Sequence, residues 1–441
     1  MDDPKVLIVG QYFNSNSGGG ITISNLFKGW NKENLLVVAD NMNNPEFNVC
    51  NKYYRIGNLE IKRRFPFNLG SSRKQISSGV LNENISSNAP ISTINKTSRW
   101  RNKYVQFLKF TGLYHYKVRY QVSKQLLNWI NTYSPDIIYT HLGDIQHIQL
   151  VNDLHQKLGL PVAIHIMDDW PDRINENGLF NSYWSKIIDK KFRSLLSSAK
   201  VLLSISDAMS NEYLQRYGLK FIPFHNPINV EHWGTVSSKS YEKNDPFIIL
   251  YAGRIGPGIK NCLLDIIDSL ETLTSKGLKI EFQIQATNYD RLLDEVAKFN
   301  FVKLNPVAKY NELPKIFSNA DTLLLGNDFD KNSISFLKYS MPTKASEYMI
   351  SGTPVLLYSS GETAVTQHAI THKWAYIVSE KKKEKLEEAI FELYNDERLR
   401  MHIGETAKAY AKENYDDKAV RERFKKSLMV HPKENQNTTN T

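Results

Sequence analysis

Twice in this chain a short, almost wholly apolar run is followed by a glycine-containing loop and then by a helical pattern. The first run covers residues 5–10 and leads through the loop 14–20 into a helix expected at 21–30. The second covers residues 247–252 and leads into a helix expected at 261–275. Such runs are typical of strands buried on both faces of a parallel sheet. Because strands and helices alternate after each opening, the sequence predicts an α/β protein with two Rossmann-like domains facing each other across a cleft.

The length of 441 residues also suits two domains better than one. We expect an N-terminal domain over residues 1–226, a linker over 227–245 and a C-terminal domain over 246–412. A helix over 413–430 is expected to pack back on the N-terminal domain. The polar tail 431–441 is expected to be disordered.

Cysteine content and hydropathy limit the class of protein. The two cysteines, Cys50 and Cys262, lie far apart and form no CxxC pattern, so neither a disulfide framework nor a structural zinc site is expected. The first residues lack a signal-peptide pattern, and no stretch has the roughly 18 apolar residues of a spanning helix. We therefore expect a cytoplasmic protein.

Positive charge is concentrated in one segment. Residues 52–124 hold fifteen Lys and Arg against two acidic residues, whereas the whole chain has a net charge of +10. Within it, residues 60–103 have weak periodicity, which predicts a basic, partly mobile insertion. Interleaved cations and aromatics suit peripheral contact with an anionic membrane at its inner face. Nucleic acid is the other polyanion this pattern would suit, although not the partner we expect. A flexible, solvated insertion is an equally strong alternative.

A glycine-rich turn follows the first strand expected in the second half. Gly253 and Arg254 come directly after the strand, and Lys260 and Asn261 open the next helix. Glycines let the backbone approach a ligand, and a helix N-terminus offers free N–H groups. Two nearby cations suit a diphosphate. A tight turn with solvated cations is the alternative, but the position at a strand's carboxyl end favours a binding site.

A second polar cluster opens a later helix. Pro342 suits the first turn, and Lys344 and Glu347 are three residues apart on one face. A carboxylate near a helix start can bind both hydroxyls of a ribose. A capped helix with an internal ion pair would explain this cluster if it stood alone.

Together the two clusters resemble the GT-B glycosyltransferases of family 4. The resemblance spans roughly residues 5–430, apart from the basic insertion. Further matching segments are Gly18-Gly19-Gly20, His165-Ile166-Met167-Asp168-Asp169-Trp170-Pro171, Ser204-Ile205-Ser206-Asp207, Pro223-Phe224-His225-Asn226-Pro227 and Gly352-Thr353-Pro354-Val355.

This resemblance implies roles for individual residues. Arg254 and Lys260 would hold the donor diphosphate and stabilise the leaving group, and Glu347 would bind the ribose. Similar enzymes retain the anomeric configuration without a bound metal, so we expect a UDP- or GDP-sugar co-substrate and no metal. The donor-binding residues that it implies are Gly18, Gly19, Gly20, Gly253, Arg254, Lys260, Asn261, Pro342, Thr343, Lys344 and Glu347.

One position departs from the family pattern. The family often has a Glu eight residues before Glu347 that contacts the sugar, and Tyr339 stands there in this chain. The identity of the sugar is therefore open.

In the N-terminal domain, the main candidate site residues lie in and directly after the strand expected at 162–167. We expect Asp168 to lie near the transferred sugar or the acceptor, with His165 supporting it. A core position for His165 is an equally strong alternative. Asp169 is expected to cap the next turn, and His141 is a weaker candidate on the acceptor side.

A short acidic match lies in the second half. Asp328-Phe329-Asp330 fits the DxD metal–nucleotide motif of the other large glycosyltransferase fold. Because such matches arise by chance, we interpret it as a solvated loop.

These expectations give one leading function and two alternatives. The leading function is transfer of a sugar from a nucleotide-sugar to a glycan or lipid-linked saccharide in surface polysaccharide or glycoconjugate synthesis. A nucleotide-sugar epimerase on the same scaffold is one alternative. The other is a non-catalytic protein that binds polyanions or membranes.

Overall fold

The computed structural model describes residues 3–15, 17–42, 44–68, 76–83, 99–173, 178–236 and 239–429, with the side chains of 99–102, 172–173 and 235–236 left aside. The expected tail 431–441 and much of the expected insertion lie outside these residues. The chain divides into two compact units. The first comprises residues up to Phe224 and the chain from Arg421 onward, and the second comprises His225–Val420.

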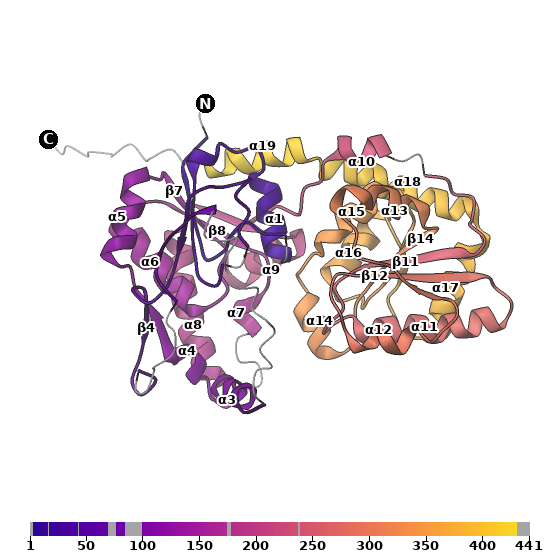
Figure 1. The fold of residues 1–441 in the computed structure, drawn as a ribbon, viewed down its shortest axis with the longest axis horizontal. Helices are drawn as coiled ribbons and strands as arrows, with labels where there is room; N and C mark the ends of the chain where they lie inside the picture. Colours follow the sequence, from indigo (N-terminus) through magenta and orange to yellow (C-terminus); the bar gives the residue numbers. More distant parts are fainter. Residues whose placement is uncertain are drawn as a thin grey trace. The chain divides into compact units, whose positions relative to one another are not determined.

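The first unit is built on an eight-stranded sheet in the order β10-β9-β8-β7-β1-β2-β3-β5 (Figure 1). Its strands pair in parallel except for β3 and β5. Every residue of the four central strands is buried, as expected for strands covered on both faces. The strands are β1 Val6–Val9, β2 Leu35–Ala39, β3 Tyr53–Arg55, β5 Gly79–Leu81, β7 Ile137–Thr140, β8 Val162–Ile166, β9 Val201–Ser204 and β10 Ile222–Pro223.

Several helices of this unit begin at side-chain caps. Ser17, Ser123, Asp144 and Ser206 each accept a hydrogen bond from a backbone N–H in the first turn of the helix that follows. Helix α9 ends at Gly218, which has the left-handed conformation typical of a glycine at this position. The helices are α1 Gly18–Phe27, α3 Arg99–Phe110, α4 Leu113–Lys117, α5 Lys124–Tyr133, α6 Ile145–Leu158, α7 Trp170–Arg173, α8 Asn181–Ser198 and α9 Asp207–Tyr217.

Parts of the expected insertion are ordered in the structure. Strand β4 (Ile61–Arg63) pairs antiparallel with β6 (Val118–Tyr120) in a separate two-stranded ribbon. The buried carboxylate of Glu60, just before β4, accepts hydrogen bonds from the hydroxyls of Tyr54, Ser78 and Ser123. A carboxylate with several donors anchors this stretch, because leaving it unpaired in the interior would be costly.

The second unit contains a six-stranded, fully parallel sheet in the order β13-β12-β11-β14-β15-β16. Counted along the chain, this is the order 3-2-1-4-5-6 of dinucleotide-binding folds. Its apolar core packs between the sheet and helices α11 and α17. The strands are β11 Phe247–Gly253, β12 Ile280–Ala286, β13 Val302–Leu304, β14 Thr322–Gly326, β15 Val355–Tyr358 and β16 Tyr376–Val378.

The helices of this unit alternate with the strands and close the chain. They are α10 Val230–Val236, α11 Lys260–Ser275, α12 Arg291–Val296, α13 Leu313–Asn319, α14 Lys331–Leu337, α15 Thr343–Ser351, α16 Ala364–His372, α17 Lys383–Asn395 and α18 Glu397–Asn414, followed by α19 Asp417–Leu428. Among the residues that the structure describes, no helix is both long and apolar enough to cross a membrane.

Residues 227–245, expected as a linker, pack within the second unit. Ile228 forms a parallel bridge with Asp416. The backbone carbonyl of Tyr241 accepts hydrogen bonds from Arg400, and Lys239 donates to the carbonyl of Ala320 at 2.6 Å. These bonds hold the segment too tightly for it to act as a loose connection.

The last part of α19 belongs to the first unit. The ring of Phe424 lies 5.0 Å from Phe27 and 5.4 Å from Phe224, centroid to centroid. Edge-to-face packing of this kind adds stability beyond the buried area. The chain therefore returns to its first unit through an aromatic cluster.

Candidate functional site

Each unit has one place where the order of its strands reverses. In the first unit it lies between β1 and β7, and in the second between β11 and β14. Ligands of open α/β sheets bind beyond the carboxyl ends of the strands at such switch points. The predicted site residues lie on the loops that follow these and neighbouring strands and in helices α1, α11 and α15, except His165, which lies within β8, and Gly253, which ends β11.

The loop after β11 in the second unit is held in place from several directions. Gly253 has a φ of +154°, which a residue with a side chain rarely adopts. The hydroxyl of Tyr251 donates to the carbonyl of Arg254 at 2.7 Å. The side-chain amide of Asn288 bonds both the N–H and the carbonyl of Ile255, each at 2.8 Å. Sequence analysis missed Asn288, because its role depends on two strands being neighbours.

Lys344 reaches this loop from the first turn of α15. Its Nζ lies 3.4 Å from the carbonyl oxygen of Ala252 and 4.3 Å from the centroid of the Tyr251 ring. A Cβ built on Gly253 would lie 3.0 Å from the same Nζ. The structure therefore brings together Gly253 and Lys344, which are 91 residues apart in the sequence.

Burial changes the charge states of the two polar residues on α15. It lowers the pKa of Lys344 to about 8 and raises the pKa of Glu347 to about 7, against the opposing effect of Lys344 on Glu347. Both charges are held out of water without full compensation. A bound anion beside Lys344 would restore its usual pKa, so this arrangement suits an anionic ligand.

Tyr348 fastens the start of α15 to the end of β11. Its buried hydroxyl accepts from the N–H of Ala252 and donates to the carbonyl of Ala252, both at 3.0 Å. Pro342 is the N-cap of the helix and supplies no capping side chain. The first amides of α15, including those of Thr343 and Lys344, therefore lack side-chain caps and remain available to a ligand.

The other two predicted cations differ from each other. Arg254 is exposed, and among the described residues its guanidinium has no hydrogen-bond or ion-pair partner. Lys260 instead forms an ion pair with Asp290, with Nζ 2.6 Å from Oδ2. The hydrogen bond from Lys260 lowers the pKa of Asp290. Lys260 would have to leave or share Asp290 in order to bind a diphosphate.

The prediction of a solvated loop at the DxD sequence holds for the exposed Asp330 and is wrong for Asp328. Asp328 is buried, and its Oδ1 accepts the N–H of Cys262 at 2.7 Å while its Oδ2 accepts from the side chain of Asn261 at 3.3 Å. Asp330 caps α14 through the N–H groups of Asn332 and Ser333, both at 3.1 Å. The N-terminus of α11 therefore already has a carboxylate, which reduces its attraction for another anion.

Tyr339 lies just before α15, where the family often has Glu. It is partly buried, and the Nζ of Lys338 lies 5.3 Å from its ring centroid.

No group of three or more His, Cys, Asp and Glu side chains that could hold a metal ion occurs in the part of the chain that the structure describes.

In the first unit, Gly18–Gly20 form the first turn of α1 instead of the expected loop, so the expected helix start at residue 21 is wrong, and Asn14 fixes this turn. Its Oδ1 accepts from the backbone and the hydroxyl of Ser17, each at 3.0 Å, and Ser17 caps α1 through the N–H of Gly20. A Cβ on Gly20 would lie 2.2 Å from Asn14 Nδ2, so only glycine fits there. A Cβ on Gly19 would lie 3.8 Å from His141 Cε1, which places this turn beside the end of β7. Gly18 begins α1 and is exposed.

The two adjacent aspartates after β8 have different environments. Asp169 is buried and accepts from both terminal nitrogens of Arg216, at 2.9 and 3.0 Å, and from the hydroxyl of Tyr213 at 3.0 Å. Its predicted role as a cap is therefore wrong. Asp168 is more exposed, and burial lowers the pKa of the neighbouring His141 against the opposing effect of the Asp168 carboxylate. Of the two, Asp168 is the more accessible to a ligand.

His165 lies inside the first unit. Its ring is fully buried, and its Nδ1 is 2.6 Å from the hydroxyl of Tyr139 on β7. Burial lowers the pKa of His165 to about 3. The structure thus favours the core alternative for this residue, which supports the site only by shaping the sheet beneath it.

A further acidic and histidine cluster, which sequence analysis missed, lies at the same end of the sheet. His147 Nδ1 is 2.9 Å from Asp144 Oδ1, and its Nε2 is 4.0 Å from Asp40 Oδ1. Burial opposes protonation of His147, but the two carboxylates outweigh it and raise its pKa. The hydroxyl of Tyr120 donates to Asp40 at 2.7 Å. These residues could have been found only by knowing that β1, β2 and β7 are neighbours.

Comparison with known proteins supports the architecture. No family model and no curated protein matches the chain. HepE of Anabaena, solved in complex with UDP and glucose, matches with a TM-score of 0.61 and 12% identity over 97% of this chain and 100% of that one. Sucrose-phosphate synthase of Thermosynechococcus elongatus matches with a TM-score of 0.57 and 12% identity over 96% and 98%. A glycosyltransferase of Rickettsia africae matches with a TM-score of 0.58 and 11% identity over 98% and 100%.

The chain has the GT-B fold. The matches span nearly the whole chain and nearly the whole of each of these structures, so both Rossmann-like units are included. The prediction of an α/β protein with two such domains is confirmed. The assignment to family 4 stays a prediction.

Proposed function

We propose that this protein is a glycosyltransferase that moves a sugar from a nucleotide-sugar to a glycan or lipid-linked saccharide. The proposal rests chiefly on the switch point of the second unit, where Lys344 and the loop from Gly253 to Arg254 meet at one strand end. It is supported by the fold, which is similar to that of proteins solved with UDP and UDP-glucose.

In this proposal the second unit binds the donor. Arg254, Lys344 and a released Lys260 neutralise the diphosphate, and Glu347 accepts hydrogen bonds from the ribose. The cations also stabilise the charge that develops on the leaving nucleotide, so no metal is required. The donor is a UDP- or GDP-sugar.

The first unit then contributes to the sugar and the acceptor. Asp168 and His141 lie together at the end of its sheet, and the Gly18–Gly20 turn lies beside them. We infer transfer with retention, in which the acceptor attacks from the face that the nucleotide leaves. His165 stays a supporting residue beneath this surface.

The basic segment is proposed to bring the enzyme to its acceptor. Phe107 and Phe110 on α3 are each more than half exposed, and Lys103 and Lys109 lie on the same helix. Exposed aromatics beside cations suit peripheral contact with an anionic membrane at its cytoplasmic face. This placement fits an acceptor of surface polysaccharide or glycoconjugate synthesis.

Nucleotide binding in EDTA provides the test. We expect one of UDP, GDP, ADP and CMP to raise the melting temperature of the wild-type protein, and Arg254→Ala to reduce that shift. A ligand at about 100 times its Kd stabilises by roughly 2.7 kcal/mol. If none of the four shifts the wild-type protein, the proposed donor site is wrong.

Incubation with the donor alone tests the epimerase alternative. An epimerase would convert the donor without an acceptor, whereas a transferase would leave the configuration of its sugar unchanged. A non-catalytic polyanion-binding protein would also leave the donor unchanged, and it would not turn the donor over when an acceptor is added.

A further inference from the structure

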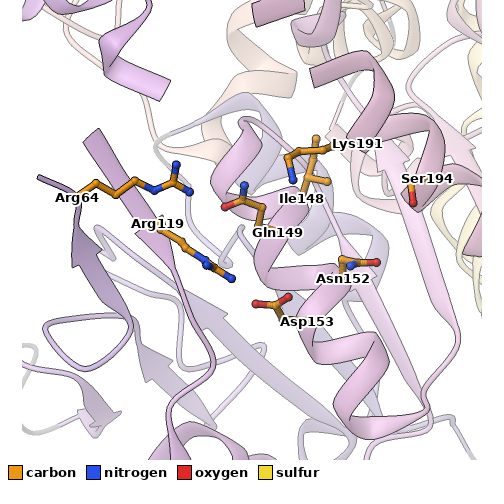
Figure 2. A pocket seen from close by; sticks show the side chains of 8 residues that line it. All are labelled: Arg64, Arg119, Ile148, Gln149, Asn152, Asp153, Lys191 and Ser194. Atoms are coloured by element: carbon orange, nitrogen blue, oxygen red, sulfur yellow. The ribbon is translucent and has the colours of Figure 1, made fainter. Parts of the chain in front are cut away.

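The first unit contains a cavity of about 300 Å³ away from the loops at its switch point. One wall is the β4–β6 ribbon and the other is formed by helices α6 and α8. Figure 2 shows Arg64 and Arg119 extending from the ribbon toward α6, with Lys191 coming from α8. At about 30 Å³ per water molecule, the cavity has room for roughly ten waters, which is more than a single small ion fills.

The register of the β4–β6 ribbon determines on which face each of its cations lies. Arg119 pairs with Lys62 in the antiparallel register, and the backbone of Arg64 donates to Lys117. Side chains alternate between the two faces of a strand, so Lys62, Arg64 and Arg119 share one face and Arg63 points to the other. Of the three cations on this face, Arg64 and Arg119 line the cavity.

The wall is fixed against α6 before any ligand binds. The side-chain amide of Gln146 donates to the carbonyls of His115 at 3.1 Å and Val118 at 3.4 Å. Arg64 is further held by Tyr116, whose ring centroid lies 5.0 Å from its guanidinium carbon. A preformed wall lowers the entropy cost of binding.

The cavity has an excess of positive charge that its lining offsets only in part. It is lined by three cations and one carboxylate, that of Asp153. None of the three cations forms an ion pair with any residue that the structure describes. Concave surfaces with one sign of charge focus the field and attract counter-ions. Guanidinium groups in particular match the geometry of phosphate oxygens.

The neutral and acidic groups narrow the class of ligand. Asn152 and Ser194 line the same cavity and can bond hydroxyl groups, and Asp153 can accept hydrogen bonds from hydroxyls. A carboxylate would repel a bare phosphate but would bind the hydroxyls of a sugar or glycerol attached to one. The lining thus suits a ligand that carries both a phosphate and hydroxyl groups.

We propose that this cavity is a second binding site, for a phosphate group attached to a hydroxyl-bearing carbon skeleton. Arg64, Arg119 and Lys191 bind the phosphate, and Asp153 and Asn152 bind the neighbouring hydroxyls. The site goes beyond the proposed sugar transfer and needs none of the donor-binding residues. Its ligand can be a soluble sugar phosphate or the glycerophosphate head of a lipid.

Titration calorimetry in EDTA tests the site with glucose 1-phosphate and sn-glycerol 3-phosphate as soluble probes. Wild type and Arg254→Ala are expected to bind the better probe equally, because the donor site is not involved. Arg119→Gln and Lys191→Gln should each weaken binding by about tenfold or more, since each removes a charge-assisted contact. Circular dichroism checks that the variants fold.

Two matched controls remove the same charge nearby. Lys190→Gln alters the exposed neighbour of Lys191 on α8, and Arg63→Gln alters the other face of the ribbon. Both should bind like wild type. If the controls lost as much affinity for the probe as the cavity variants, the effect would come from the overall charge of the surface, and the proposal would be overturned.

Vesicles distinguish the two sources of the ligand. Phosphatidylglycerol vesicles that bind wild type but not Arg119→Gln, without competition from the soluble probes, would assign the site to a lipid head group. Binding of glucose 1-phosphate that Arg119→Gln weakens, without binding of the wild type to the vesicles, would assign it to a soluble sugar phosphate. Absence of binding to both the vesicles and the soluble probes would overturn the proposal.

Discussion

The two units share a strand order at their centres but carry opposite chemistry at their switch points. In the second unit the loops after β11 and the start of α15 present Arg254, Lys260 and Lys344. In the first unit the corresponding strand ends are surrounded by Asp40, Asp144, Asp168 and two histidines. The same backbone arrangement therefore serves different ligand groups.

This difference assigns the two halves of the proposed reaction. A cationic strand end suits the diphosphate of the donor, whereas carboxylates and histidines suit hydroxyl groups, which donate and accept hydrogen bonds. In this proposal the strand order that the two units share does not determine which unit binds the nucleotide. The side chains on a few loops do.

The largest expected effect concerns Lys344. Lys344→Met keeps the length of the half-buried side chain but removes the charge at the end of β11, so we expect kcat/KM for transfer to fall by about 10²- to 10³-fold. Lys331→Met, at an exposed lysine on α14, should leave kcat/KM unchanged. Full activity in Lys344→Met would remove the basis for placing the donor in the second unit.

The adjacent aspartates of the first unit should separate stability from activity. Asp169→Ala leaves Arg216 without its buried partner, and we expect the free energy of unfolding to fall by about 3 kcal/mol, the lower end for such pairs because Arg216 is partly exposed. Asp168→Asn should leave the denaturant midpoint near that of wild type and lower transfer activity instead. The reverse pattern would exchange the proposed roles of the two residues.

The glycine-rich turns of the two units should respond differently to a methyl group. Gly20→Ala places a Cβ 2.2 Å from the fixed side chain of Asn14, so we expect a loss of about 1–3 kcal/mol in stability. Gly253→Ala meets the flexible end of Lys344 and should weaken nucleotide binding as well as stability. Thermal unfolding with and without nucleotide measures both. Comparable effects on nucleotide binding in the two variants would show that the turns are equivalent.

The smallest expected effect is the pH dependence of nucleotide binding. The pKa of Lys344 is lowered to about 8, so its charge is lost as the pH rises through that value. The pKa of Glu347 is raised to about 7, so its carboxylate is lost as the pH falls through that value. Affinity should be greatest between these limits and decline by up to about tenfold per pH unit beyond them. Calorimetry should show that Lys344→Met lacks the decline on the alkaline side, and an unchanged alkaline decline would exclude Lys344 as its cause.

Much of the fold followed from local patterns. The apolar run at β1, a helix shortly after it and the helix that begins after Pro342 were all predicted, because each depends on neighbouring residues in the sequence. The ribbon of β4 and β6 was not predicted. Its two short strands are stabilised by pairing with each other across more than fifty residues, which no local pattern reveals.

The sequence by itself determined the α/β alternation, the glycine-rich turns and the residue types available at each strand end, since these depend on periodicity and backbone freedom over short distances. Tertiary structure alone decided which of those residues meet. Tertiary packing brought Lys344 next to Gly253 and Asp290 next to Lys260. It also placed Asp328 at the N-terminus of α11, and Arg64 and Arg119 in one cavity with Lys191. Contacts between segments far apart in the chain are selected by packing and by the pairing of buried charges. These interactions contribute to stability only once the sheets have formed.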